Sequence, residues 1–370
     1  MITCTAAVAR APDADFTIET LSLEGPRAGE VLVKIAGVGL CHTDLVFRDQ
    51  VAAFAKPAVL GHEGSGVIEA VGEGVTGLKV GDKVVVGFSS CGACPRCAEK
   101  LPTYCLHFPP LNYAGMRLED GSTAFSKNGE RVSSHFFGQS SFATHAVTRV
   151  GNVVKVDGKT ALPLELLGPL GCGLMTGAGA VMNSMDCKPG STLAVFGGGP
   201  VGLAAVMAGK IRGCSTIILI EPIAERRKIG SELGATHTID PAAGPVADAI
   251  RAILPVGVDA VLDTSGVVAV IEAGLASLSP HGVIGMVGVP KDAAASVTFN
   301  IGQVMTFGHR IIGIIEGDSV PQDFIPELLA HHAAGRFPFD RLIKTFPLAQ
   351  INEAVAAQAR GECIKVVLTP

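Results

Sequence analysis

A glycine-rich turn between a strand-like run and a helix-like run most limits how this chain can fold. The segment AVFGGGPVGLAAVMAGK places Gly197, Gly199 and Gly202 in a G-x-G-x-x-G pattern. The first glycine permits a tight turn, the second lets the backbone approach a pyrophosphate, and the third lets the helix pack closely on the strand. The helix N-terminus would then direct its free N–H groups at the phosphates. The pattern predicts a parallel α/β sheet that binds a dinucleotide.

The next strand-like run, TIILIE, supports this interpretation. It ends in Glu221, nineteen residues after Gly202. A carboxylate at this spacing accepts hydrogen bonds from the adenosine ribose and repels a 2′-phosphate, which favours NAD over NADP. Arg226 and Arg227 follow closely and could bind a phosphate, so NADP stays open as an alternative.

The chain divides into two stretches of different pattern. The first 170 residues alternate short β-branched runs, such as VLVKIAGV and KVVVGF, with glycine-rich turns, which favours a mainly antiparallel, barrel-like domain. From Ser191 onward, strand-like runs alternate with helical ones, which is typical of βαβ units on a parallel sheet. Because 370 residues are too many for one ordinary core, we expect two domains.

Composition and charge exclude several classes of function. The chain has 29 Lys and Arg against 34 Asp and Glu and no basic run, so neither nucleic acid nor an anionic membrane is an expected partner. Its mean hydropathy is positive, at +0.43, but a glycine-proline turn interrupts the longest uncharged stretch, 192–209. The start has no apolar run of signal-peptide length. We therefore expect a cytoplasmic protein whose ten cysteines are mostly reduced thiols or metal ligands.

Four cysteines lie within fifteen residues, in CGACPRCAEKLPTYC. Two C-x-x-C steps and a further cysteine across a short loop can surround one tetrahedral Zn²⁺ with thiolates. Disulfides or unrelated thiols are the alternatives, which the cytosolic setting and the clustering disfavour. A four-thiolate site has no open position, so this zinc would be structural. The predicted ligands are Cys91, Cys94, Cys97 and Cys105.

A catalytic zinc needs three protein ligands and an open position. The candidates are Cys41 in GLCHTDLVF, His62 in GHEGSGVIEAV, and Cys172 in LGPLGCGLM. Separations of 21 and 110 residues do not by themselves assemble a site. A lone buried histidine or cysteine is usually part of a core.

The segment GHEGSGVIEAVGEGV fills the pattern G-H-E-x-x-G-x-x-x-x-x-G-x-x-V. The chain resembles the zinc-containing alcohol dehydrogenases of the medium-chain superfamily over essentially its whole length. The other motifs that carry this resemblance are CHTD, the four cysteines, GCG followed by TG, and GGGPVG. HFFGQSSFATHAV, GCGLMTGAGAVMN and IIEGDSVPQDFIPELL are most similar to bacterial aryl-alcohol (benzyl alcohol) dehydrogenases. The resemblance implies an α/β fold. A GroES-like, mainly antiparallel β barrel would comprise 1–173 and 312–370, and a Rossmann domain with a doubly wound parallel sheet 174–311.

The resemblance also implies roles for individual residues. Cys41, His62 and Cys172 would hold the catalytic zinc. The side chains around this zinc would be Thr43, which receives the substrate's proton, Asp44, which accepts a hydrogen bond from the histidine ligand, and Glu63, which lies behind the metal. The cofactor contacts would be Thr176, Val201, Val287 and Ile314 at the nicotinamide, Arg226 near the adenosine ribose, and Lys365 at the pyrophosphate. An aromatic-rich substrate pocket would be lined by Phe88, Tyr104, Phe136, Phe137, Val289 and Ile315.

The implied reaction is the reversible oxidation of primary aromatic or allylic alcohols, such as benzyl alcohol, to aldehydes by hydride transfer to NAD, with two Zn²⁺ per chain. A homo-oligomer, a dimer or a tetramer, is expected to pair through the dinucleotide domain, with GVIGMVGV and the segment after it at the edge. Three alternatives stay open: a glutathione-dependent formaldehyde or geraniol-type dehydrogenase, a non-catalytic dinucleotide-binding protein, and an enoyl or quinone reductase.

One position departs from the family pattern. Many members carry a histidine five residues after the first cysteine ligand, where it passes the substrate's proton to solvent, but this chain has Val46. His42 stands where other members often have an arginine against the pyrophosphate. We expect His42, or water beside it, to complete the proton path from Thr43; a weak phosphate contact is the alternative.

Overall fold

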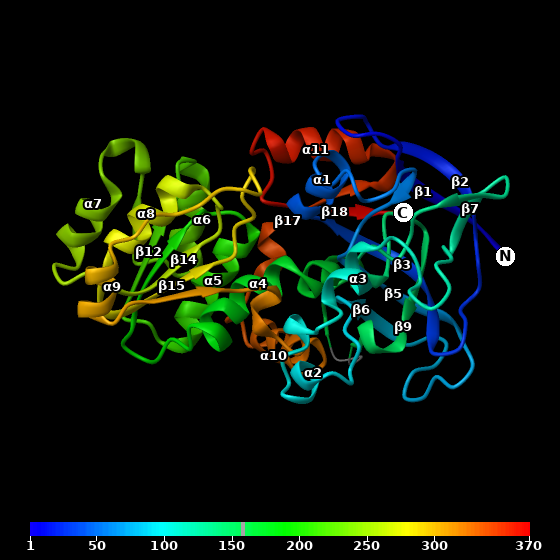
Figure 1. Ribbon diagram of the computed structural model, residues 1–370, viewed down its shortest axis with the longest axis horizontal. Helices are drawn as coiled ribbons and strands as arrows, with labels where there is room; N and C mark the ends of the chain where they lie inside the picture. Colours follow the sequence, from blue (N-terminus) through cyan, green and yellow to red (C-terminus); the bar gives the residue numbers. More distant parts are fainter. Residues whose placement is uncertain (157–159) are drawn as a thin grey trace. The chain divides into compact units, whose positions relative to one another are not determined.

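Three β-sheets organise the described residues, 1–156 and 160–370, of this computed structural model (Figure 1). The chain forms two units. The first comprises Met1–Gly173, Val320–Ala333 and Asp340–Pro370, and the second comprises Leu174–Ser319 and Ala334–Phe339.

A parallel sheet forms the centre of the second unit. Its strands run in the order β13-β12-β11-β14-β15-β16, and every neighbouring pair is parallel. Runs such as TLAVF and TIILI are almost wholly apolar because a parallel sheet is buried on both faces. The strands are β11 (Thr192–Phe196), β12 (Thr216–Ile220), β13 (His237–Ile239), β14 (Val258–Asp263), β15 (Leu278–Met286) and β16 (Arg310–Gly313).

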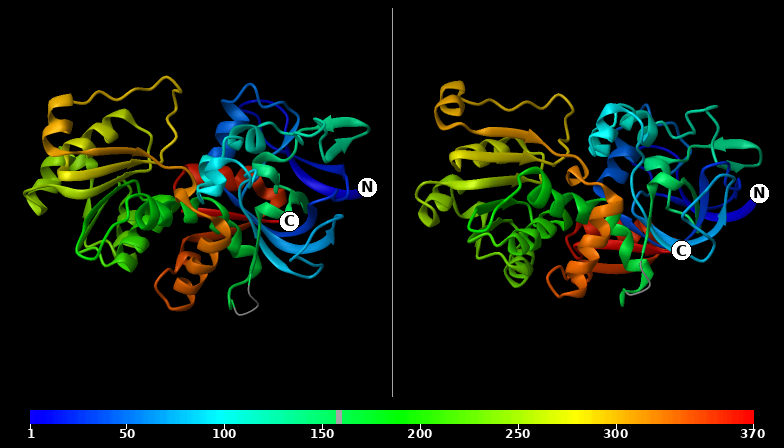
Figure 2. Two further views of the ribbon diagram at one scale, coloured as in Figure 1. Left: turned by 60° about the horizontal axis from the view of Figure 1, so that its bottom comes forward. Right: turned by 90° about the horizontal axis from the view of Figure 1, so that it is seen from below.

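Helices cover both faces of this sheet (Figures 1 and 2). On one face, Gly209 of α5 (Pro200–Arg212) packs directly on Leu193 and Ile217. The alternate strand residues, including Ala194 and Ile218, point to the other face, against α7 and α8. The expected doubly wound sheet is confirmed, and its strand order reverses between β11 and β14, where such folds bind their ligands. The other covering helices are α6 (Ala224–Leu233), α7 (Val246–Ile253) and α8 (Val268–Ala276).

The second unit extends beyond residue 311, the expected end of the dinucleotide domain. β16 continues the sheet to Gly313, and the unit ends at Ser319. The run GVIGMVGV is also not the edge, because β15 pairs with a strand on each side and β16 lies at the edge. Residues 287–300 connect β15 to α9 without regular structure (Figure 2). The remaining elements are α4 (Gly173–Gly179), η5 (Ala180–Ser184), η6 (Pro241–Ala243), α9 (Ile301–Phe307) and η7 (Glu316–Asp318).

The first unit contains two mainly antiparallel sheets, as expected. One runs β4-β1-β2-β7-β8 and the other β10-β6-β5-β3-β18-β17, with β9 also paired to β3; the β17–β18 pair is parallel. The strands are β1 (Ile2–Ala9), β2 (Thr17–Leu23), β3 (Glu30–Leu40), β4 (Ala58–Val59), β5 (Gly64–Val71), β6 (Lys83–Val86), β7 (Phe125–Lys127), β8 (Glu130–Val132), β9 (His145–Arg149), β10 (Val153–Lys155), β17 (Ile343–Pro347) and β18 (Lys365–Thr369).

Strand β3 brings distant parts of the chain to one place. Val38 pairs with Gly64 at the start of β5, and Leu40 pairs with Val366 near the start of β18. The residues just outside these pairs therefore meet at one end of β3. The helical segment η4 packs across β3, β5 and β6 and ends one residue before Cys172.

Short helices fill the remaining surface of the first unit. Within the described residues no single helix is long and apolar enough to cross a membrane; one bent pair, 164–171 with 173–184, passes that test by length and composition only. The helices are α1 (His42–Asp49), α2 (Pro95–Ala98), η1 (Pro102–Tyr104), α3 (Phe108–Tyr113), η2 (Phe136–Gly138), η3 (Val150–Asn152), η4 (Leu164–Gly171), α10 (Pro321–Ala333), η8 (Phe339–Leu342, which begins in the second unit), η9 (Leu348–Gln350) and α11 (Ile351–Ala359).

The core of the parallel sheet can be tested by truncating one central side chain. Ile218→Ala removes a fully buried side chain from β12, and we expect the free energy of unfolding to fall by about 3 kcal/mol because a cavity remains. Urea unfolding of the variant measures this loss. Val256→Ala, at an exposed turn position, should change it by less than about 0.5 kcal/mol, and similar losses in both variants would contradict the assigned core.

Candidate functional site

Four potential metal ligands meet at the end of β3. The ligand atoms of Cys41, His62, Glu63 and Cys172 all lie within 4.8 Å of one another. Cys41 follows β3 directly, the His62–Glu63 pair precedes β5, and Cys172 follows η4. The structure therefore brings together the three candidate ligands that sequence spacing could not assemble.

Asp44 fixes the orientation of the histidine. One carboxylate oxygen, Oδ1, lies 2.9 Å from His62 Nδ1 and accepts the Gly61 N–H at 3.0 Å, and Oδ2 accepts the Cys41 N–H at 2.9 Å. Although burial opposes it, the Asp44 charge raises the pKa of His62 well above its ordinary value. With Nδ1 directed at the carboxylate, the other ring nitrogen, Nε2, faces the thiols and has no hydrogen-bond partner in the described part of the chain. An imidazole held this way is oriented as a metal ligand.

Glu63 and Lys365 form a buried ion pair behind these ligands. Lys365 Nζ lies 2.5 Å from Glu63 Oε2 and donates to the Leu40 carbonyl at 3.0 Å. Burial raises the pKa of Glu63 to about 6, against the opposing charge of the ammonium. Lys365 is only 2% exposed, and its ammonium lies within this cluster; its expected contact with the pyrophosphate stays a prediction.

The two thiols complete a donor set that fits zinc. A hydrogen bond from Cys172, together with the charge of His62, lowers the pKa of Cys41 well below its ordinary value despite burial. Two sulfurs and one imidazole nitrogen are the ligands of a catalytic zinc that keeps one position open. The site can thus hold Zn²⁺ by the chemistry of its donors.

The start of α1 places the predicted proton carriers beside this cluster. The Cys41 thiol donates to Thr43 Oγ1 at 3.7 Å. His42 is exposed, and Val46 is partly buried. Because these two residues are four positions apart on one helix, they share a face.

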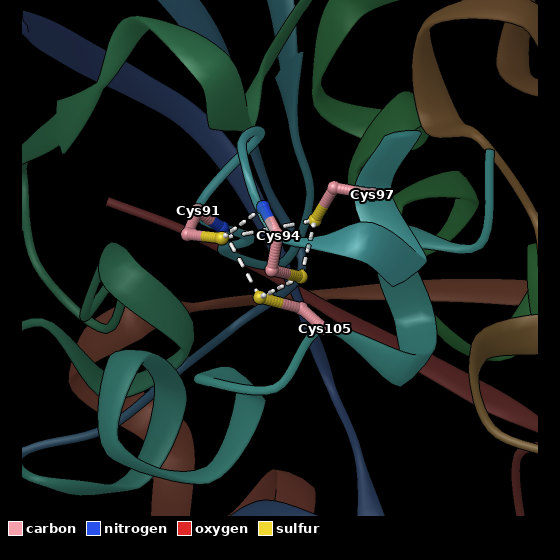
Figure 3. A group of neighbouring side chains, drawn as sticks. All are labelled: Cys91, Cys94, Cys97 and Cys105. Atoms are coloured by element: carbon pink, nitrogen blue, oxygen red, sulfur yellow. Dashed lines mark hydrogen bonds between the residues drawn. The ribbon is translucent and has the colours of Figure 1, made fainter. Parts of the chain in front are cut away.

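The four clustered cysteines form a second donor set (Figure 3). Their sulfurs lie 3.6 to 3.9 Å apart in the measured pairs, and backbone N–H groups of Cys91 and Cys94 donate to sulfurs of the set. Backbone N–H groups of Cys97 and Leu106 lower the pKa of the Cys94 thiol to about 6. Burial raises the pKa of the Cys97 thiol to about 12, so the thiolate form is stabilised at Cys94 and not at every member. Four sulfurs at this spacing fit a closed zinc site.

The expected pocket aromatics occupy different surroundings. Phe137 stacks on the His62 ring at 4.4 Å between centroids, and Phe136 meets the ring edge-on at 5.4 Å. Phe88 is buried against Phe108, whereas Tyr104 is 38% exposed on η1. The other rings of this aromatic cluster were not predicted from the sequence; they are Phe47, Phe54, Phe108 and Tyr113.

In the second unit, the glycine turn has the predicted backbone. Gly197 has a φ of +104°, and a side chain on Gly202 would collide with the Gly197 carbonyl oxygen. Glu221, buried at the end of β12, accepts the Gly198 N–H at 2.6 Å and the Ile223 N–H at 2.8 Å. The carboxylate therefore lies against the glycine turn at the start of α5. This matches the arrangement that a dinucleotide requires.

The other predicted cofactor contacts are distributed around the same sheet. Val287 follows β15 and donates its N–H to the Asp263 carbonyl, and Ile314 donates to the Met286 carbonyl. The buried Nε atom of Arg226 has no hydrogen-bond partner among the described residues. The remaining predicted cofactor contacts are Thr176, whose hydroxyl lies 3.4 Å from the Glu316 carboxylate, and Val201 at the start of α5. Two residues predicted for the substrate pocket also belong to this unit: Val289, which is exposed, and Ile315, which is partly buried.

Two protein families match the chain. Residues 27–158 match the alcohol dehydrogenase GroES-like domain, and residues 200–333 match the zinc-binding dehydrogenase family. The first range contains His62 and the four clustered cysteines, and the second begins at Pro200, the first residue of α5.

Named relatives align over nearly the whole chain. A geraniol dehydrogenase from Castellaniella defragrans is 48% identical over 99% of this chain and 98% of its own. The crystal structure of a benzyl alcohol dehydrogenase from Acinetobacter calcoaceticus is 40% identical, with a TM-score of 0.95 over 100% of this chain and 99% of that one. An alcohol dehydrogenase zinc-binding domain protein from Burkholderia ambifaria is 48% identical, with a TM-score of 0.96 and the same coverage.

Asp44 can be tested by an isosteric change. Asp44→Asn keeps the shape of the side chain but replaces one acceptor oxygen by an amide nitrogen, which would face a buried backbone N–H or the imidazole N–H. Because two donors then face each other, we expect the free energy of unfolding to fall by about 2–4 kcal/mol. Chemical unfolding of the zinc-loaded protein measures this. Asp240→Asn, at an exposed cap of η6, should cost about 1 kcal/mol or less, and an equal loss there would argue against a special role for Asp44.

Proposed function

We propose that this chain, which belongs to the zinc-containing alcohol dehydrogenases of the medium-chain dehydrogenase/reductase superfamily, reversibly oxidises primary aromatic or allylic alcohols to aldehydes with NAD⁺. The observation that carries the substrate class is the set of aromatic rings packed on and around His62, a candidate ligand of the catalytic metal. Flat, apolar groups gain most from such surroundings, by stacking and by burial of area.

The two named relatives support the same class of substrate. Geraniol is an allylic primary alcohol and benzyl alcohol an aromatic one, so in both an unsaturated carbon adjoins the carbon that loses hydride. Their shared chemistry is narrower than that of alcohols in general. We favour benzyl alcohol, and a geraniol-type enzyme is the alternative within this class.

We assign the catalytic zinc to Cys41, His62 and Cys172. When bound there, zinc acts as a Lewis acid that lowers the pKa of the substrate's hydroxyl. Asp44 holds His62 in the tautomer that leaves Nε2 available. Because the four clustered cysteines leave no open position, we assign a second, structural zinc to them.

Thr43 and His42 would move the substrate's proton. The Thr43 hydroxyl, beside the Cys41 sulfur, would receive the proton. His42 shares a face of α1 with Val46 and is exposed, so it can reach solvent from the surface on which other members place their histidine. We propose that His42, with water, replaces that residue.

The acidic end of β12 supports NAD as the cofactor. The Glu221 carboxylate lies against the glycine turn, where a 2′-phosphate would meet a negative charge. Arg227 donates to the Glu221 and Pro222 carbonyls and pairs with Asp240, so its charge is already used. Arg226 remains the residue that could favour NADP.

An exposed apolar edge supports a homo-oligomer. Near β16, the edge strand, Ile301 and Met305 are 76% and 77% exposed, and Phe299 and Phe307 are more than 40% exposed. An edge strand with exposed apolar residues near it favours pairing with a second copy. We propose a dimer or tetramer through this edge, in the cytoplasm, where the metal-binding thiols stay reduced.

The substrate class is tested by cofactor reduction with the zinc-loaded protein. NAD⁺ and NADP⁺ are each supplied with benzyl alcohol, geraniol, ethanol, or formaldehyde plus glutathione. We expect kcat/KM with NAD⁺ to be about a hundredfold higher for benzyl alcohol than for ethanol, since roughly 100 Å² more apolar area is buried.

Each other outcome excludes part of the proposal. Equal rates for ethanol and benzyl alcohol contradict the aromatic or allylic class. A strong preference for the glutathione adduct indicates the formaldehyde enzyme. A preference for NADP⁺ contradicts the role given to Glu221. No turnover of any substrate would favour the non-catalytic alternative.

The proton path is tested at His42. His42→Ala should lower the rate of benzyl alcohol oxidation by about tenfold or more near neutral pH and change its pH profile, because the relay loses the imidazole that carries the proton. His145→Ala, a histidine on β9 that pairs with Glu69, is the control and should leave both unchanged. A wild-type pH profile in His42→Ala would rule out the relay.

A further inference from the structure

A short segment beside His62 has a backbone that side chains rarely allow. His135, Phe137 and Ser140 have φ values of +57°, +49° and +55°, and Gly138 lies between them at +69°. A positive φ is unfavourable for any residue with a Cβ, and most of all for a bulky one. Such a conformation persists only where its surroundings hold it, so the contacts of this segment indicate what it is for.

The side chain of Gln139 is the centre of those contacts. Its Nε2 donates to the carbonyls of His62 at 2.9 Å, Gly87 at 3.0 Å and Val86 at 3.2 Å. Its Oε1 accepts the Gly64 N–H at 3.0 Å. The residue is almost fully buried, and every polar atom of its amide is used.

The amide holds the backbone that directly follows the histidine. It binds the carbonyl of His62 itself and the N–H two residues later, and it ties both to β6 through Val86 and Gly87. A Cβ on Gly64 would lie 2.9 Å from the amide oxygen, so glycine is needed for this approach. Ser141 Oγ donates to the same oxygen at 2.5 Å and orients the amide.

The ring of His62 is held by the same segment. Phe137 stacks on its face at 4.4 Å with 22° between the planes, and Phe136 contacts its edge. With Asp44 on Nδ1, the backbone, the face and one nitrogen of the histidine are all constrained. Only Nε2 is left to face the two thiols.

We propose that Gln139 is a positioning residue that sets the geometry of His62 as a metal ligand. This inference rests on the proposed function, in which His62 binds the catalytic zinc. Residues that orient a ligand in this way affect metal affinity by about ten- to a hundredfold. Loss of the amide frees the backbone at residues 62–64 and lets the imidazole move relative to Cys41 and Cys172.

The experiment compares metal release from the wild-type protein and from Gln139→Met, which keeps the length but not the hydrogen bonds. A chelator with a coloured zinc complex reports release, and cobalt at the same site reports ligand geometry through its visible bands. We expect the metal ion bound by His62 to be released about 10–100-fold faster and the cobalt bands to shift. The release rate of the metal ion at the four clustered cysteines should stay unchanged.

Asn352→Leu is the matched control. The Asn352 amide pins the backbone of Phe16 by two hydrogen bonds of 2.9 Å elsewhere in the same unit and contacts none of the candidate ligands. It should lower the melting temperature but leave metal release and cobalt bands as in the wild type. If Gln139→Met likewise lowered the melting temperature but left metal release and the cobalt bands unchanged, Gln139 would serve stability alone. That result would overturn the proposal.

Two further measurements keep the outcomes distinct. If Gln139→Met does not fold, Ser141→Ala can be measured, because it removes one of the two hydrogen bonds to the amide oxygen. It should speed metal release about threefold, and unchanged release would refute the proposal. Cys172→Ser in an otherwise wild-type chain should lose one metal ion. If it does not, the zinc assignment of the proposed function has failed, independently of Gln139.

Discussion

The pairing register of β3 is the constraint on which the candidate site depends. Each ligand is held by a short segment that would not be fixed alone. Because Val38 pairs with Gly64 and Leu40 with Val366, the residues flanking these pairs must meet at one end of the sheet. A shift of one residue in either pairing would turn its side chains to the opposite face. Backbone hydrogen bonds along β3 therefore determine the distances between donors of the cluster.

Charge balance is the second requirement of this cluster. Buried charges are costly unless each is paired or hydrogen-bonded. Lys365 balances Glu63, and three N–H donors, one of them the imidazole, surround the Asp44 carboxylate. Two thiolates remain, and a divalent ion between them would leave the cluster close to neutral. The protein thus supplies a set of groups whose net charge fits zinc.

Features that depend on neighbouring residues could be predicted from the sequence, and those that depend on distant pairing could not. The glycine turn and the four cysteines are local, so their spacing alone indicated the parallel sheet and the sulfur cluster. The three candidate zinc ligands came only from a resemblance, because their separations carry no signal. The ion pair of Lys365 with Glu63 was not predicted for the same reason: it follows from the β18 register. The edge strand β16 and the aromatic cluster on His62 likewise depend on tertiary packing.

The contact between β3 and β18 also has a consequence for how the chain matures on the ribosome. Lys365 follows Leu40, whose carbonyl it binds, by 325 residues. At ordinary rates of synthesis, about 5–20 residues per second, roughly 15–60 s pass between the two. Throughout that interval Cys41 and His62 are already made, while the strand that completes their sheet does not yet exist. Zinc captured by the nascent chain would therefore be held before Glu63 has its counter-ion, so the final affinity of the site is a property of the finished chain.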